Sequence, residues 1–170
     1  MAEGSGRDGI REALQQAYAG EAKASLRLKL YAQKAEEEGY PQIARLFRVI
    51  ARSEEIHGLR ALAVLREVRT TEENLAASFE SEAGVAQVAY ASFVKQAEAE
   101  GDRAAVLHFS QSRDVEETHA KLYKEAMAHL QEGRETTYWV CRICGYVADG
   151  VLPESCPVCG APRERFDPFV

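Results

Sequence analysis

Apolar residues recur at helical spacing over four long stretches of this chain. The stretches cover residues 10–38, 41–68, 71–100 and 103–133, and in each an apolar residue returns every three or four positions. This pattern predicts four helices that each turn one face toward a common core. A polar, Gly-rich segment over residues 1–9 precedes them, and we expect it to be a frayed tail.

Turn and cap residues mark the ends of these helices. Gly39 predicts the end of the first helix, and Pro41 suits the first turn of the second. Thr70 or Thr71 predicts the N-cap of the third helix, and Gly101-Asp102 ends that helix and caps the fourth. The apolar stripe expected for the third helix is Leu75, Phe79, Glu82, Ala86, Ala89 and Phe93. The predicted fold class of this part is therefore an all-α four-helix bundle.

The composition changes after a linker at residues 132–137. Tyr138-Trp139-Val140 is typical of a short strand, and two Cys-x-x-Cys-Gly motifs follow at residues 141–145 and 156–160. A module below about 40 residues generally needs a staple to fold, and a bound metal would supply one. We therefore predict two domains, a helical bundle over 1–135 and a small, mostly β or irregular metal-knuckle domain over 136–170.

The composition also excludes several classes of function. The net charge is −6, and no basic run with interleaved aromatic residues indicates a nucleic-acid partner. No stretch approaches the roughly 20 apolar residues that a membrane span requires. The four cysteines are clustered near one end of the chain, which favours a metal site in a reducing compartment over a secreted disulfide framework. We expect a cytoplasmic protein that binds neither membranes nor nucleic acid.

Six residues on the predicted apolar faces are of types that bind metals. Each half of the bundle has a glutamate on one helix and a Glu-x-x-His motif on the next. The six residues are Glu21, Glu54, His57, Glu82, Glu116 and His119. Ionised carboxylates in a core are costly unless a cation is bound there, and the i, i+3 spacing puts Glu and His on one helix face. This set is that of di-iron carboxylate bundles, so the sequence predicts a pair of iron ions between the helices.

The cysteines predict a second, mononuclear metal site. Its ligands would be Cys141, Cys144, Cys156 and Cys159. The glycine after each second cysteine permits a positive φ, so that backbone N–H groups can turn toward the sulfur atoms. Four thiolates bind either iron or zinc, so that an iron site and a structural zinc ribbon are both open at this point.

Taken together, these motifs resemble the rubrerythrin family over nearly the whole chain. The matching features are Ala19-Gly20-Glu21, the two Glu-x-x-His motifs, Asn74-Leu75 ahead of Glu82, Tyr90, and the two cysteine knuckles. The resemblance implies a ferritin-like bundle with two irons and a rubredoxin-like domain with one, and zinc could substitute in either site. The implied roles are bridging for Glu54 and Glu116, terminal ligation for Glu21 and Glu82, and nitrogen ligation for His57 and His119. Tyr90 would either hydrogen-bond near the iron pair or serve as a core aromatic residue.

The resemblance also implies an activity, which is the reduction of hydrogen peroxide to water. Electrons would arrive from an NAD(P)H-dependent reductase or a rubredoxin and enter through the rubredoxin-like iron. One departure affects this expectation, because the family usually has another glutamate three residues after the third-helix ligand, where this chain has Val85. Two alternatives therefore stay open: a ferroxidase or iron-handling protein that uses O₂, and a non-catalytic zinc-ribbon module on a helical bundle.

The connection between the second and third helices is a second departure. Only a few residues around 69–72 are free to link them, whereas parallel helices in a ferritin-like bundle need a link as long as the bundle. A helix of some 25 residues is about 37 Å long, far beyond the reach of such a link. Either the bundle runs up-down-up-down, or two chains exchange helix pairs. We favour a homodimer with exchanged helix pairs.

Overall fold

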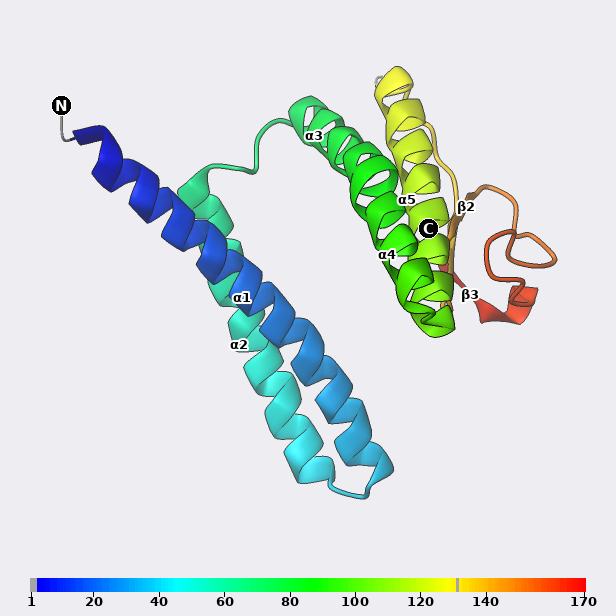
Figure 1. Ribbon diagram of the computed structural model, residues 1–170, viewed down its shortest axis with the longest axis horizontal. Helices are drawn as coiled ribbons and strands as arrows, with labels where there is room; N and C mark the ends of the chain where they lie inside the picture. The colour runs from blue at the N-terminus through cyan, green and yellow to red at the C-terminus, as the bar shows by residue number, and fades with distance from the viewer. Residues whose placement is uncertain (1–2, 131) are drawn as a thin grey trace. The chain divides into compact units, whose positions relative to one another are not determined.

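The protein's structure, a computed structural model, describes residues 3–130 and 132–170. The chain divides into two compact units, with the boundary between Arg69 and Thr70. Within the described residues the architecture is mostly helical, with a small antiparallel sheet near the C-terminal end (Figure 1). The predicted fold class is therefore confirmed.

The first unit is a helical hairpin of α1 (Glu3–Glu37) and α2 (Pro41–Leu65), which lie side by side in Figure 1. Gly39 has a φ of 81°, a left-handed conformation that costs little only for glycine, and Pro41 opens α2 as predicted. Near this turn the small side chains of Ala32, Ala35 and Ala44 are buried and let the two helices approach closely. The expectation of a frayed tail is wrong from Glu3 onward, because α1 already begins there; residues 1–2 lie outside the described part.

The second unit begins with α3 (Thr71–Gly84), which the sequence caps as predicted. The Thr70 hydroxyl accepts a hydrogen bond from the Glu73 N–H at 3.3 Å, and the Thr70 N–H donates to the Glu73 carboxylate at 3.1 Å. This reciprocal capping box satisfies two N–H groups that the first helical turn cannot pair, and it contributes about 1 kcal/mol.

A π-helical segment, η1 (Val85–Tyr90), interrupts the third predicted helix before it continues as α4 (Ala91–Glu100). The wider π turn holds one residue more than an α turn, so it shifts every later position around the helix. Ala86 is still buried as predicted, but the buried residues beyond η1 are Val94 and Ala97, and Phe93 is 42% exposed. Phe93 nevertheless packs against Phe109 of α5, with ring centroids 5.4 Å apart, so it still faces the neighbouring helix as predicted.

Helix α5 (Arg103–Ala128) lies beside α3 and α4 (Figure 1). The Asp102 carboxylate accepts hydrogen bonds from the N–H groups of Ala104 and Ala105 at 3.1 and 3.0 Å, which confirms the predicted cap. The helix ends before the predicted position near Gly133. Here the Glu132 N–H donates to the His129 carbonyl at 2.9 Å, which closes a turn in place of further helix.

A small module of three strands follows. Its strands are β1 (Tyr138–Cys141), β2 (Val147–Asp149) and β3 (Phe166–Phe169), and the 3₁₀ turn η2 (Arg163–Arg165) precedes β3. Strand β1 pairs antiparallel with both neighbours, so the strand order is β2-β1-β3. The predicted strand at 138–140 is confirmed. Cys141 and Cys156 are 1% and 2% exposed and form the centre of the module's core with Ala161 and Phe166.

Candidate metal centres

The first unit brings together three of the six predicted ligands of the iron pair. Glu21 comes from α1, and Glu54 and His57 come from successive turns of α2; each offers a ligand atom within 4.8 Å of the other two. The His57 Nδ1 lies 3.1 Å from a Glu54 oxygen and 3.8 Å from a Glu21 oxygen. A hydrogen bond and the charge of Glu54, together with desolvation, raise the pKa of Glu21. Two carboxyl groups and an imidazole that converge in this way offer three ligands to a cation, half of the six predicted for the iron pair.

The second unit repeats this arrangement with the other three predicted ligands. Glu82 from α3 faces Glu116 and His119 from α5, again with ligand atoms within 4.8 Å of one another. The His119 Nδ1 lies 3.0 Å from a Glu116 oxygen. Burial and the neighbouring Glu116 raise the pKa of Glu82 to about 6. These carboxyl groups are close enough to disfavour each other's ionisation, and a bound cation would remove that cost.

The other nitrogen of the His119 ring makes a contact that the sequence pattern did not predict. His119 Nε2 lies 3.3 Å from the backbone carbonyl oxygen of Gly145, which directly follows Cys144 in the first cysteine knuckle. With Nδ1 turned toward the carboxylates, Nε2–H donates to this carbonyl and fixes both the tautomer and the orientation of the ring. One imidazole therefore contacts the carboxylate cluster on one side and the cysteine module on the other. No sequence signal links positions 119 and 145, because only the tertiary fold brings them together.

The four cysteine sulfur atoms also converge, and their spacing fits a tetrahedral metal ion. The Cys141 and Cys159 sulfur atoms are 3.7 Å apart and those of Cys144 and Cys156 are 3.5 Å apart, too far for a disulfide. A metal–sulfur bond of about 2.3 Å gives an edge of about 3.8 Å in a regular tetrahedron. Gly145 and Gly160 have φ values of 83° and 72°, and the N–H of each donates to the carbonyl of the knuckle's first cysteine at 2.9 Å. The predicted positive φ of these glycines is confirmed.

Burial and hydrogen bonding shift the pKa values of the thiols in this cluster in different directions. Burial raises the pKa values of Cys144 and Cys159. Burial acts in the same direction on Cys141, but N–H groups of Cys144 and Ile143 outweigh it, so that the pKa of Cys141 is lowered. Oriented N–H dipoles of this kind stabilise thiolates, which are the form that binds metal.

Val85 and Tyr90 stand at the two ends of η1. Val85 is the first residue of η1 and is 36% exposed. Tyr90 is the last, and its ring packs with Phe93 and Phe109 at centroid distances of 5.9 and 6.2 Å. This packing makes Tyr90 part of an aromatic cluster, and a role of its hydroxyl near the irons stays a prediction.

Comparison with known proteins places this geometry in a class of di-iron carboxylate proteins with an attached thiolate iron. The rubrerythrin family model matches residues 12–127, and the model of the rubrerythrin rubredoxin-like domain matches residues 139–167. Rubrerythrin of Porphyromonas gingivalis is 33% identical, over 90% of this chain and 86% of its own length. Rubrerythrin-2 of Clostridium acetobutylicum is 28% identical, over 92% and 94%. The structure of mixed-valent nigerythrin is 31% identical with a TM-score of 0.59, covering 94% of this chain and 86% of that one.

The chain belongs to the rubrerythrin family. Its cofactors are accordingly a pair of irons held by glutamate and histidine ligands and a single iron held by four cysteine thiolates. Members of this family are oxidoreductases. Within the described residues, no helix is both long and apolar enough to cross a membrane.

Proposed function

We propose that this protein reduces hydrogen peroxide to water. Peroxide takes up two electrons and two protons, its O–O bond breaks, and two water molecules are released. Bound irons would supply the redox chemistry: the glutamates and histidines would hold the pair that provides electrons to peroxide, and the four thiolates would hold the iron through which electrons are replaced. The electrons originate from an NAD(P)H-dependent reductase or a rubredoxin. Because four free thiolates require a reducing environment, the proposal places the protein in the cytoplasm.

The proposal gives each predicted ligand a role. Glu54 and Glu116 would be bridging carboxylates, Glu21 and Glu82 would be terminal carboxylates, and His57 and His119 would be nitrogen ligands. The thiolate ligands are Cys141, Cys144, Cys156 and Cys159. In each half-site the histidine is held by the glutamate three residues before it, at 3.1 Å for His57 and 3.0 Å for His119. This contact keeps the imidazole rotamer aimed at the position where a cation would lie.

The contact between His119 and Gly145 is the observation that carries the proposal. A storage protein or a structural zinc ribbon has no need for a hydrogen bond between a ligand of one metal centre and the peptide that follows a ligand of the other. The bond runs from the His119 ring to a carbonyl one residue from Cys144, so a short covalent and hydrogen-bonded path joins the two centres within one unit. Such a path serves the delivery of electrons from the thiolate centre to the carboxylate centre.

The test is to follow the thiolate iron while peroxide is added. Iron-loaded protein is reduced without oxygen, freed of reductant, and mixed with hydrogen peroxide or, separately, with O₂. We expect the visible band of the oxidised thiolate iron to return with peroxide at least about tenfold faster than in Glu116→Ala, which lacks an intact carboxylate site. Equal rates in both proteins would contradict the proposal, because peroxide would then oxidise the thiolate iron directly.

The alternative is a ferroxidase that uses O₂, and Val85 is the observation that favours it. Where relatives supply an additional carboxylate, this chain has an apolar side chain, which leaves the plain ligand set of an iron-oxidising bundle. A faster return of the thiolate band with O₂ than with peroxide, in the same experiment, would support this alternative.

Replacing Val85 by glutamate should accelerate reoxidation of the reduced protein by peroxide by about tenfold. Val85 lies three residues beyond Glu82, and its N–H still bonds to the carbonyl oxygens of Ser81 and Glu82. A carboxylate there would reach the same metal as Glu82, lower the net positive charge of the centre and thus favour its oxidised state. Stopped-flow absorption measures the rate. Val88→Glu is the matched control, because Val88 lies in the same segment and is 71% exposed; equal rates in the two variants would refute the role of position 85.

The proposal includes a homodimer in which the chains exchange helix pairs. Only residues 66–70 join α2 to α3, and at about 3.5 Å per residue they span roughly 20 Å. The 25 residues of α2 are about 37 Å long, so this link is too short to return along the helix. Each unit holds three ligands, and on α2 the neighbouring Ile43 and Ile50 are 40% and 37% exposed. A second copy that supplies the other three ligands would cover this apolar stripe and complete the site.

Complementation between two inactive variants tests this exchange. If helix pairs are exchanged, a mixed dimer of Glu54→Ala and Glu116→Ala chains carries both changes in one site and leaves the other intact. Random co-assembly should therefore restore about a quarter of the wild-type activity. Without exchange, every site carries one change and no activity returns. Light scattering should also give twice the 18.8 kDa mass of one chain; a metal-loaded monomer at micromolar concentration would refute the dimer.

A further inference from the structure

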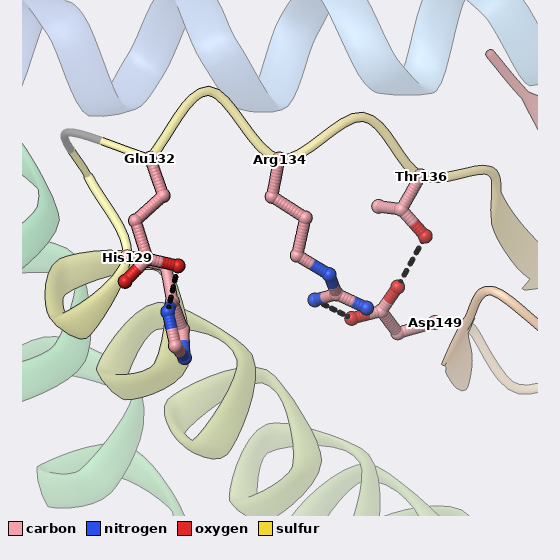
Figure 2. Close-up of polar contacts among 5 residues, drawn as sticks. All are labelled: His129, Glu132, Arg134, Thr136 and Asp149. Atoms are coloured by element: carbon pink, nitrogen blue, oxygen red, sulfur yellow. Dashed lines mark hydrogen bonds and ion pairs between the residues drawn. The ribbon is translucent and has the colours of Figure 1, made fainter.

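The linker between α5 and the cysteine module is hydrogen-bonded to Asp149, the last residue of β2. Its Oδ2 accepts a hydrogen bond from the Arg134 guanidinium at 2.7 Å, and its Oδ1 accepts one from the Thr136 hydroxyl at 2.6 Å (Figure 2). Both carboxylate oxygens thus bind the linker, and the Asp149 side chain is only 15% exposed. We call Arg134, Thr136 and Asp149 the linker clasp.

Backbone bonds extend the clasp into the module. The Gly150 N–H donates to the Thr137 carbonyl at 2.9 Å, and the Trp139 indole N–H donates to the Gly150 carbonyl at 3.3 Å. The Gly150–Thr137 bond continues the β1–β2 ladder beyond its last pair, Tyr138 and Asp149, and the Trp139 indole adds a side-chain contact. The linker therefore extends the sheet and is held to it by hydrogen bonds.

Arg134 also lies near the end of α5. A hydrogen bond from Arg134 to Asp149 and the charge of that carboxylate raise the pKa of Arg134, and the Glu125 carboxylate on α5 acts in the same direction. Arg134 shares a cavity of about 200 Å³ with Glu125, His129 and Asp149. At the end of α5, His129 pairs with Glu132 at 2.6 Å, which orders the start of the linker (Figure 2).

The clasp and the His119 contact flank β2, because Asp149 is its last residue and Gly145 lies two positions before its first residue, Val147. Gly145 and Asp149 are four residues apart, about 13 Å in extended chain. On the Gly145 side the module contacts α5 through His119, and on the Asp149 side the clasp fastens β2 to the linker that follows α5. A pocket of about 470 Å³ is lined by His119 and Leu122 of α5 and by Val147 of β2, so side chains do not fill all of the space between the helix and the strand.

We propose that the linker clasp is a positioning device that seats the cysteine module on α5, so that the Gly145 carbonyl stays within hydrogen-bond reach of His119. Asp149 acts through Gly145 and His119 and contacts neither metal site itself. The inference rests on the proposed electron path, because it assigns the clasp to the maintenance of that path. The clasp does not affect the spectrum or the reduction potential of the thiolate iron, since all four cysteines lie outside it.

Asp149→Asn tests the clasp because it keeps the shape of the side chain and removes its charge. Loss of one charge-assisted hydrogen bond shifts a local opening equilibrium by about tenfold. The first readout is trypsin cleavage after Arg134, which releases residues 135–170 as a fragment that mass spectrometry identifies; we expect it to be about tenfold faster in the variant. The second is the rate at which peroxide oxidises the reduced thiolate iron, which should fall by a similar factor while its visible spectrum and potential stay unchanged.

Glu154→Gln is the matched control. It removes the same charge from an ion pair of equal length, Glu154 with Arg163 at 2.7 Å, which lies within the module and does not touch the linker. Both readouts should match wild type in this variant. If Asp149→Asn loses the thiolate iron, Thr136→Val and Arg134→Gln replace it as test variants, because both side chains lie in the linker. The rate at which peroxide oxidises the reduced thiolate iron in these variants then decides whether the clasp has a positioning role.

The two readouts test the positioning role of the clasp separately from the proposed function. Faster cleavage with unchanged electron transfer, or no change in either readout, overturns the positioning role. If peroxide does not oxidise the thiolate iron of wild-type protein through the carboxylate site, the proposed function fails. The cleavage readout still shows whether the clasp holds the module, because it needs no turnover.

Discussion

Replacing Glu116 by alanine should empty the carboxylate site and leave the thiolate iron in place. Iron content should fall from about three to about one per chain, and peroxide reduction should fall by about 100-fold or more. Glu116 lies against both Glu82 and His119, so its loss removes the central member of that half-site. Metal analysis and the thiolate absorption band measure the two centres separately. The control is Glu117→Ala, an exposed neighbour on the same helix; a wild-type iron content in Glu116→Ala would refute the assignment.

The same variant should change how the metal-free protein responds to pH. The folded-state pKa of Glu82 is raised from 4.5 to about 6, so folding disfavours its charged form. A raised carboxyl pKa makes the folded state more stable at pH 5 than at pH 7, and this stabilisation is lost as the pH rises through the folded-state value. Because Glu82 is partly exposed, we expect an effect of about 1 kcal/mol after allowance for solvent screening. Urea unfolding of chelator-treated protein should show this slope in wild type and a flatter one in Glu116→Ala; a wild-type stability that falls toward pH 5 would contradict it.

Replacing Cys141 by alanine should have the complementary effect. The sulfur of Cys141 is 1% exposed at the centre of the module's core, and the module is too small to fold without its metal. Iron should fall from about three to about two per chain, with the loss confined to the thiolate band. Turnover that depends on an external electron donor should stop. A single reaction of peroxide with the chemically reduced iron pair should persist, because the bundle ligands are untouched.

Ile143→Ala is the control for this experiment. Ile143 lies between the two cysteines of the first knuckle and is 60% exposed, so its truncation leaves the core of the module intact. Loss of all iron in Cys141→Ala would show that the two centres are not independent. Retention of donor-dependent turnover would show that electrons do not enter through the cysteines.

Local rules of sequence predicted most of the helices and the grouping of the ligands. Caps at Thr70 and Asp102 and the turn at Gly39 depend only on neighbouring residues, so they can be predicted from a short window. Each Glu-x-x-His pair lies on one face of one helix for the same reason. The partition into two groups of three ligands also follows the sequence order of the helix pairs.

Features that depend on tertiary contact could not be predicted in this way. The π segment changes the number of residues per turn within a helix whose residues are all compatible with an ordinary α-helix. No single residue therefore predicts it. The His119–Gly145 bond joins positions 26 residues apart across two different elements. The linker clasp depends on the pairing register of β1 and β2, which places Asp149 opposite Tyr138 and thus beside the linker.

The π segment has a consequence for which changes of length this helix can accept. Glu82 lies before the wide turn, and Val94 and Ala97 are buried after it. Deleting one residue between positions 87 and 89 would restore ordinary α geometry and still bring both faces into alignment, because the turn already holds one residue in excess. An insertion there would rotate the later half of the helix by about a further 100° and expose its buried face. We therefore expect this stretch to tolerate the loss of one residue better than the gain of one.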